Sequence, residues 1–167
     1  MRLRPLALVT LAASFTLLLS ACGADPERAA IEEYLASAES IGDQMSGAGS
    51  RFETLMNAQG DMTAWTPAEK TEVHAIGDTF DRLEAEARLV AVPPILIDAH
   101  PLLIQSLTEL NAAVHGVIDM ADHPERVTEA AADELTKKAT LGEQYGTEYV
   151  EKVKAALGEK YPDLVKE

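Results

Sequence analysis

The sequence of 167 residues predicts an all-α fold, specifically an antiparallel four-helix up-and-down bundle. Apolar residues recur at alternating spacings of three and four in four successive stretches, the pattern of helices that bury one face. Residues typical of a helix start precede each stretch, and the connections between stretches are short. No window alternates apolar and polar residues over enough positions to indicate a strand. Four amphipathic helices with short connections are expected to pack as an antiparallel bundle.

The first predicted helix begins at Asp25-Pro26-Glu27. Asp is the N-cap, Pro occupies the first helical position, and Glu places an acid in the first turn. Its apolar positions are spaced 3-4-3-4-3-4-3, a heptad seam over more than three repeats. The seam consists of Ile31, Tyr34, Ala38, Ile41, Met45, Ala48, Phe52 and Leu55.

Three glycines, Gly42, Gly47 and Gly49, interrupt this first helix. Each costs a helix interior up to about 1 kcal/mol relative to Ala. Either a neighbouring element packs closely against them, or the helix bends or breaks near residues 46–50. A binding cleft at the glycines is a third alternative, and the sequence does not decide whether the helix is continuous.

The second predicted helix begins at Thr66-Pro67-Ala68-Glu69, a capping box with proline at the first position, and Pro93-Pro94 ends it. The third begins near Asp98, with Pro101 tolerated in the first turn because its missing N–H would have no partner there. We expect the third helix, which has the widest apolar face, to be the most buried. The seams are Val73, Ile76, Phe80, Leu83, Ala87 and Val90, then Leu103, Leu107, Leu110, Val114, Val117 and Ala121.

Asp122-His123-Pro124-Glu125 is expected to cap the fourth helix, which ends near Gly158 and Pro162. Its seam is less regular, because Lys137-Lys138 and Gly142 lie near its middle. If the helices alternate in direction, the start of the first helix, the Pro-Pro turn and the C-terminus share one end of the bundle. The apolar positions are Val127, Ala131, Leu135, Tyr145, Tyr149, Val153 and Ala156.

Composition limits the possible partners. The chain has 14 Lys and Arg against 28 Asp and Glu, a formal net charge of −14. This excess of acid disfavours nucleic acid, because a polyanion's partner needs a surplus of basic residues. One cysteine excludes an internal disulfide, a Cys-rich zinc cluster and a covalent haem motif. No repeats or interdomain linkers are visible, which indicates a single domain.

Residues 1–21 are typical of an export signal. Arg2 and Arg4 supply a positive start, and residues 6–19 form an uncharged apolar run. Its length, about 14 residues, fits the roughly 7–15 of a signal core and is short of the roughly 20 of a membrane span. The run ends in Leu19-Ser20-Ala21-Cys22, and the segment resembles the signal peptide and lipobox of bacterial lipoproteins. An ordinary secretory signal or an uncleaved anchor is the alternative that charge, core length and lipobox together disfavour.

The resemblance covers this segment alone and implies diacylglyceryl transfer to Cys22, cleavage before it and acylation of the new amino terminus. Two or three acyl chains anchor a protein stably without a spanning helix. The chain then consists of a signal peptide, residues 1–21, and a single helical-bundle domain, residues 22–167, tethered through Cys22. This covalent lipid is the only expected cofactor. Gly23, in place of an Asp, favours the outer membrane in a diderm host and the outer face of the cell membrane in a monoderm.

A second resemblance covers about ten residues, from Pro93-Pro94 to His100-Pro101-Leu102. A proline-rich turn followed by a histidine and an apolar helix is similar to small helical lipoproteins of unassigned function. The resemblance implies a helical fold and carries no activity.

Two histidine–carboxylate pairs have the i,i+4 spacing of a helix face: His74 with Asp78, and His115 with Asp119. Two imidazoles and two carboxylates would suit zinc or a similar divalent ion. The seams place each pair at heptad positions b and f, which face water in a simple bundle. We therefore predict surface residues that point apart and hold no metal.

His100 lies on the seam of the third helix, seven residues before Leu107. We expect a structural role, with the imidazole hydrogen-bonded to a neighbouring carbonyl or carboxylate near the helix start. A ligand-binding or proton-sensing role is the alternative. Met62 and Trp65 lie on the predicted loop between the first two helices, at the end of the bundle away from the lipid. Displayed on that loop, they are candidates for contact with a partner.

No nucleophile–base–orienter set, phosphate-binding loop or dual Glu-x-x-His motif is present, so we predict no enzyme activity. The predicted function is that of a lipid-anchored cell-envelope protein acting as a non-catalytic interaction or structural module. Its expected partners are the membrane, through the lipid, and an unidentified envelope protein. The alternative is a small-ligand or metal-binding lipoprotein accessory to transport. A solidly packed bundle favours the first, and an internal cavity near His100 or the glycines favours the second.

Overall fold

The computed structural model describes residues 25–58 and 64–165. This part of the chain contains helices and no strand, so the prediction of an all-α fold is confirmed. None of the described helices is both long enough and apolar enough to cross a bilayer. The expected signal peptide and Cys22 lie outside the described residues. The long helices are α1 (Pro26–Ala58), α2 (Pro67–Leu89), α3 (His100–Asp122) and α4 (Glu129–Gly158), with short 3-10 helices η2 (Pro94–Leu96), η3 (Pro124–Arg126) and η4 (Pro162–Leu164).

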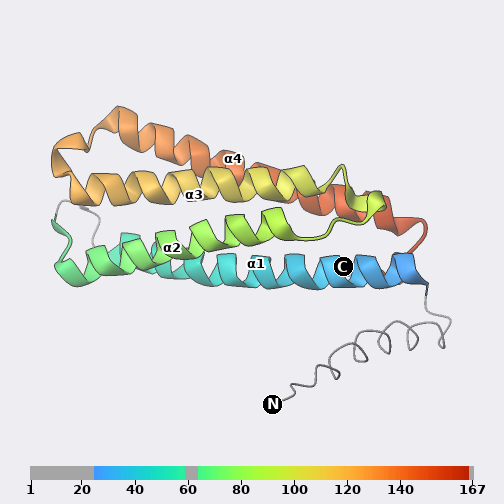
Figure 1. The fold of residues 1–167 in the computed structure, drawn as a ribbon. Coiled ribbons are helices and arrows are strands. Elements are labelled where there is room, and N and C mark those ends of the chain that lie inside the picture. The colour runs from blue at the N-terminus through green and yellow to red at the C-terminus, as the bar shows by residue number, and fades with distance from the viewer. Residues whose placement is uncertain (1–24, 59–63, 166–167) are drawn as a thin grey trace, which may run out of the picture.

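The four long helices lie alongside one another in an elongated arrangement, and consecutive helices pack against each other (Figure 1). Toward one end lie the start of α1, η2 and the end of α4, whereas α2 stops short of the start of α1. The other end holds the α1–α2 and α3–α4 connections (Figure 1). We call the first the proximal end and the second the distal end.

The predicted seams of the first three helices form the core. Along α1, Ile31, Tyr34, Ile41, Ala48 and Leu55 are buried. Eleven residues of α3 are buried, against six of α2 and two of α4, so α3 is the most buried helix, as expected. Hydrophobic burial along these seams is the main force holding the helices together.

Two helix starts follow the sequence prediction closely. The Thr66 hydroxyl accepts a hydrogen bond from the Glu69 backbone N–H at 3.3 Å, and the Thr66 backbone N–H donates to the Glu69 carboxylate at 2.6 Å. This is the reciprocal capping box. At α1, the Glu27 backbone N–H donates to the Asp25 carboxylate at 3.0 Å, with Pro26 as the first helical residue.

The start of the fourth helix differs from the prediction. Residues Pro124–Arg126 form the separate helix η3, and α4 begins at Glu129. Thr128 is the N-cap, because its backbone is extended and its hydroxyl accepts from the Ala131 N–H at 3.1 Å. Val127, expected on the seam, instead lies in the extended connection and is 37% exposed.

Neither a close neighbour nor a break occurs at the glycines of the first helix. Helix α1 is unbroken from Pro26 to Ala58, and a Cβ built on Gly42, Gly47 or Gly49 would meet nothing within 4 Å. The close helix approach occurs elsewhere, between α3 and α4. A Cβ on Gly142 would lie 2.6 Å from Leu110 Cγ and 3.1 Å from the Ser106 carbonyl oxygen, so only glycine lets the two helices come this near.

Candidate functional site

His100 lies inside the bundle, at the first residue of α3, and is 8% exposed. Its seam position turns the imidazole toward α1 and α2. Nδ1 of His100 lies 3.2 Å from the hydroxyl oxygen of Tyr34, a fully buried residue of α1. The two rings meet edge to face, with centroids 5.7 Å apart.

Two further hydrogen bonds extend this contact to the other helices. The Tyr34 hydroxyl also bonds to the Tyr149 hydroxyl on α4, and the His100 imidazole bonds to the Ala87 backbone on α2. We call Tyr149, Tyr34, His100 and the Ala87 carbonyl the tyrosine–histidine chain. It joins all four long helices through one line of polar atoms. Sequence reasoning placed His100 at a helix start beside a carbonyl but missed both tyrosines, although both lie on the predicted seams.

The hydrogen-bond directions in this chain follow from the chemistry of its members. A carbonyl oxygen only accepts, so the imidazole nitrogen that faces Ala87 carries a hydrogen. In a neutral imidazole the other nitrogen is then an acceptor, and we assign Nδ1 of His100 as accepting from the Tyr34 hydroxyl. Tyr34 in turn accepts from Tyr149. Every polar atom of the chain thus has a partner, as buried polar groups require.

Burial keeps the chain uncharged. Desolvation lowers the pKa of His100 below its ordinary value, partly offset by the hydrogen bond to Ala87. Burial raises the pKa of Tyr34 well above its ordinary range, and burial also raises the pKa of Tyr149. If His100 gains a proton, the chain reverses, with Nδ1 donating to Tyr34 and Tyr34 to Tyr149. Protonation therefore costs buried charge but no hydrogen bond.

The four candidate metal ligands are exposed, but their histidines do not pair along their own helices. His74 Nε2 lies 2.9 Å from the Asp122 carboxylate on α3, and His115 Nε2 lies 3.0 Å from the Asp81 carboxylate on α2. Each imidazole therefore points across to the neighbouring helix. The expectation that the two pairs point apart is wrong.

The close approach of α2 and α3 explains these crossed pairs. A Cβ on Gly77 would lie 2.6 Å from Ile118 Cδ1 and 3.6 Å from His115 Cε1, so positions that face water in an evenly spaced bundle here reach the next helix. Asp119 is bonded to Arg126 at 2.6 Å. Among the residues that the structure describes, no three His, Cys, Asp or Glu side chains are grouped as a metal site.

A polar cluster that sequence reasoning missed lies beside His115. Asn111 is 9% exposed, and its amide nitrogen donates to Asp81 at 2.8 Å and to Glu84 at 3.1 Å. The hydrogen bond from Asn111, with a smaller contribution from His115, lowers the pKa of Asp81 below its ordinary value. The Asn111 side-chain oxygen is buried without a hydrogen-bond partner in the described part of the chain. The signal available in the sequence was Asn111 itself, a side-chain amide within the apolar stretch of the third helix.

Of the two candidate contact residues on the first loop, the structure describes only Trp65. Met62 lies outside the described residues. Trp65 is 5% exposed and packs in the distal core cluster with Val73 and Ile76, so its expected display on the surface is wrong. A large aromatic side chain beside an apolar helix end stabilises the fold more when buried than when exposed.

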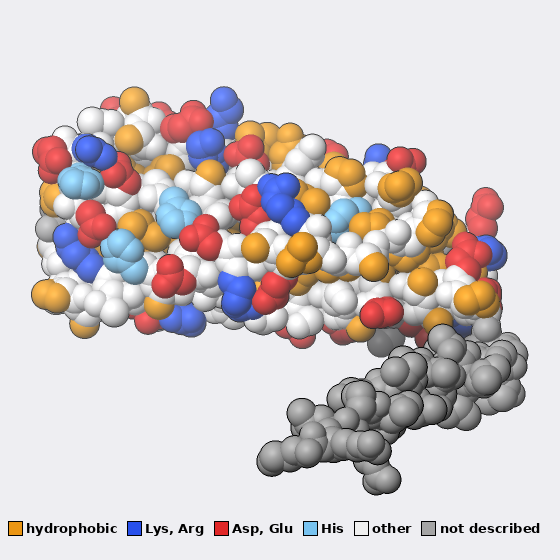
Figure 2. Space-filling view, viewed as in Figure 1, with side chains coloured by type: hydrophobic (Ala, Val, Ile, Leu, Met, Phe, Trp, Pro, Cys, Tyr) orange, Lys and Arg blue, Asp and Glu red, His pale blue; other side chains and the backbone are white. Residues whose placement is uncertain are grey.

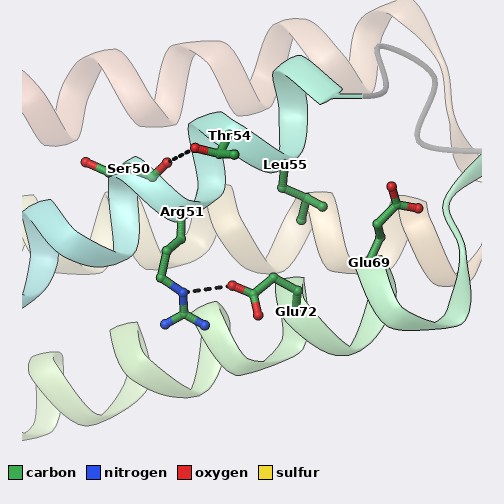
Figure 3. Close-up of a pocket in the computed structure, with 6 residues that line it drawn as sticks. All are labelled: Ser50, Arg51, Thr54, Leu55, Glu69 and Glu72. Carbon is green, nitrogen blue, oxygen red and sulfur yellow. Dashed lines mark hydrogen bonds and ion pairs between the residues drawn. The ribbon is translucent and has the colours of Figure 1, made fainter.

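Two shallow depressions lie between α1 and α2. One, of about 410 Å³, is drawn in Figure 3, where Arg51 reaches from α1 to Glu72 on α2 at 2.8 Å. The other, of about 450 Å³, lies nearer the proximal end. Neither is lined by His100 or by the glycines of α1. The first is lined by Ser50, Arg51, Thr54, Leu55, Glu69 and Glu72, and the second by Glu33, Ala36, Ser37, Ser40, Ile41, Glu86 and Val90.

The connection between α2 and α3 is a further surface feature that sequence reasoning missed. Residues 89–97 are Leu-Val-Ala-Val-Pro-Pro-Ile-Leu-Ile, nine positions without a polar side chain. We call this segment the apolar connection. Leu89 is 85% exposed and Ile97 63% exposed. The signal was an unbroken apolar run at a position where a connection is expected to be polar.

The fold and site define an all-helical protein with a buried tyrosine–histidine chain. Comparison of the sequence with protein-family models and curated proteins, and of the chain with solved structures, found no match.

Proposed function

We propose that this chain is a lipid-anchored cell-envelope protein whose antiparallel four-helix bundle is a non-catalytic interaction or structural module. One observation carries the proposal. The single cysteine of the chain, Cys22, directly follows Leu19-Ser20-Ala21 at the end of an uncharged apolar run that begins after Arg2 and Arg4. The thiol is then the acceptor of a diacylglyceryl group, and residues 1–21 are removed.

The helical domain is consistent with this role. Helix α1 begins at Pro26, so the folded part starts close to the proposed lipid. Three core clusters run along the bundle, and its buried histidine is occupied by hydrogen bonds within the protein. These contacts favour interaction through the outer surface over uptake of a small ligand at His100. In a diderm host the protein would reside at the outer membrane, with an unidentified envelope protein as partner.

One observation favours the alternative function, a small-ligand or metal-binding lipoprotein accessory to transport. In the cluster of Asp81, Glu84 and Asn111, the Asn111 oxygen is buried without a partner in the described part of the chain. A ligand that donated a hydrogen bond there would complete the cluster.

The decisive experiment is Cys22→Ser in the producing cell, followed by separation of membrane and soluble fractions. We expect the wild-type chain in the membrane fraction, with an intact mass that matches a chain starting at residue 22 and carrying acyl groups. Cys22→Ser should lose these groups and leave the membrane fraction. Ser20→Ala, which preserves the cysteine and a small residue beside it, is the matched control. Unchanged fractionation of Cys22→Ser would refute the proposal.

A further inference from the structure

The two ends of the bundle carry connections of opposite character. At the distal end, residues 122–128 include Asp, His, Glu, Arg and Thr side chains. At the proximal end, the nine residues of the apolar connection include none that is polar. Connections at a water-exposed surface are usually polar, and a run of exposed apolar residues usually serves contact with another molecule or a membrane.

The core holds the apolar connection firmly in place. Leu96 is fully buried beside Ile31 of α1 and Leu157 of α4, and Val92 and Ile95 pack partly against the same cluster. Leu89 and Ile97 remain outside, each more than half exposed. In Figure 2 apolar side chains are more frequent toward the proximal part of the visible face, where charged side chains are also present, and most of the visible histidine side chains lie toward the distal part. The exposed side chains of Leu89 and Ile97 therefore belong to a segment that buried Leu96 holds to the core.

The proposed lipid lies at this same end. Three residue steps separate Cys22 from Asp25, and a chain of that length spans at most about 11 Å. Helix α1 starts immediately afterwards, and its first seam residue, Ile31, packs in the same cluster as Leu96. A membrane that holds the acyl chains of Cys22 must then come close to the proximal end.

Three carboxylates at the proximal end have hydrogen-bond or ion-pair partners within the protein. The Asp25 carboxylate accepts a hydrogen bond from the Tyr161 hydroxyl at 3.1 Å, and Lys160 contacts Glu27 at 2.5 Å. The Asp163 carboxylate pairs with Arg28 at 2.6 Å. These partners reduce the repulsion of the three carboxylates from anionic headgroups, whereas the exposed Asp98 beside Ile97 adds to it.

We propose that the apolar connection rests in the interface of the bilayer that holds Cys22, with Leu89 and Ile97 at the boundary between headgroups and acyl chains. This inference rests on the proposed lipid anchor. The anchor alone fixes the distance between domain and membrane but leaves the domain free to rotate. A second, apolar contact fixes the orientation, with the side of the bundle that carries Leu89 and Ile97 turned toward the lipid.

The test uses the full lipidated chain, purified and reconstituted in vesicles of phosphatidylethanolamine and phosphatidylglycerol. A nitroxide label is attached at Leu89→Cys or Ile97→Cys, and its relaxation by a water-soluble nickel chelate and by oxygen is measured. We expect the nickel accessibility at both positions to fall at least about threefold on reconstitution, with oxygen accessibility rising. Val127→Cys, an exposed apolar position at the distal end, is the matched control and should not change. Circular dichroism verifies that each labelled chain is folded.

The other outcomes separate this inference from the proposed anchor. If the protein floats with the vesicles but positions 89 and 97 stay as accessible to nickel as position 127, the membrane contact is refuted and the anchor stands. If purified wild-type protein carries no lipid and does not float, both proposals fail. If shielding occurs in native envelopes but not in protein-free vesicles, the apolar connection binds a protein and the membrane assignment is overturned.

Discussion

The hydroxyl oxygen of Tyr34 on α1 lies 3.2 Å from Nδ1 of His100 on α3, inside the proximal half of the bundle. Around this contact the core is built from apolar seams, which pack at several registers of similar free energy. A hydrogen bond between two fixed polar atoms is satisfied in one register only. The contact therefore favours the native alignment of α1 with α3, in addition to its contribution to stability.

Tyr34→Phe tests this contribution directly. The substitution keeps the ring but removes the hydroxyl, leaving Nδ1 of His100 and the Tyr149 hydroxyl without their buried partner. We expect the free energy of unfolding to fall by about 1–3 kcal/mol, measured by urea denaturation. Tyr145→Phe, at a half-buried tyrosine on α4, is the control and should stay within about 0.5 kcal/mol of wild type. Equal stability of Tyr34→Phe and wild type would contradict a structural role for the chain.

Stability should depend on pH through His100. Its pKa is lowered by burial in the folded protein, whereas the unfolded chain has the ordinary value of 6.5. Just below that value the unfolded chain binds the proton more readily, so the contribution of His100 is complete above pH 6.5. It declines as the pH falls from there toward the lower, folded pKa. The free energy of unfolding, measured by urea denaturation from about pH 8 to about pH 5, should fall more steeply for wild type than for His100→Gln.

The slope with pH, and not the absolute stability, is the informative quantity, because His100→Gln also removes hydrogen bonds. His123→Gln, at an exposed histidine of the distal end, serves as the control and should retain the wild-type slope. Parallel curves for wild type and His100→Gln would show that the buried imidazole does not titrate in this window.

Two glycine substitutions are expected to change the free energy of unfolding in opposite directions. Gly142→Ala places a methyl group 2.6 Å from Leu110 Cγ and 3.1 Å from a backbone oxygen of α3, so the helices must move apart. A loss of about 1–3 kcal/mol should follow. Gly47→Ala adds a methyl group in open space within a helix and should gain about 0.5–1 kcal/mol. Thermal unfolding followed by circular dichroism measures both, and a shift of the two midpoints in the same direction would contradict the structural assignment.

Metal content distinguishes the proposed function from its alternative. His74 and His115 direct Nε2 toward Asp122 and Asp81 on the facing helix, so a metal would have to displace two formed hydrogen bonds. We expect less than one equivalent of zinc, manganese or iron in protein purified without chelators, measured by mass spectrometry of the elements. Stoichiometric metal that disappears in His74→Ala or His115→Ala would establish a metal site and overturn the surface role.

The parts of the fold that depend on short-range spacing could be predicted from the sequence. The seams of the first three helices and the capping box at Thr66 involve residues within a few turns of one another, so local periodicity and capping chemistry suffice. The predicted start of the fourth helix was wrong because two residues able to cap a helix, Asp122 and Thr128, lie six residues apart. Only the three-dimensional path of the chain selects Thr128.

The candidate site was less predictable because its contacts join residues far apart in the sequence. His100 was identified by its seam position, but the bond to Tyr34 depends on how α1 is aligned with α3. The crossed pairs of His74 and His115 depend on the separation of α2 and α3, which Gly77 sets. Heptad positions assume one constant helix spacing and therefore cannot predict where two helices approach more closely.

Helix α4 is held unevenly along its length. In the described chain, its buried residues are Gly142 and Leu157, and Leu135 is the one side chain before Gly142 that enters a core cluster. We therefore expect the distal half of α4 to open locally at a lower free energy than the rest of the bundle. Its amide hydrogens, from about residue 132 to residue 141, should then exchange with solvent before those of α3, as hydrogen-exchange measurement would show. Native fluctuations are thus expected to begin at the distal end, with α1, α2 and α3 still folded together.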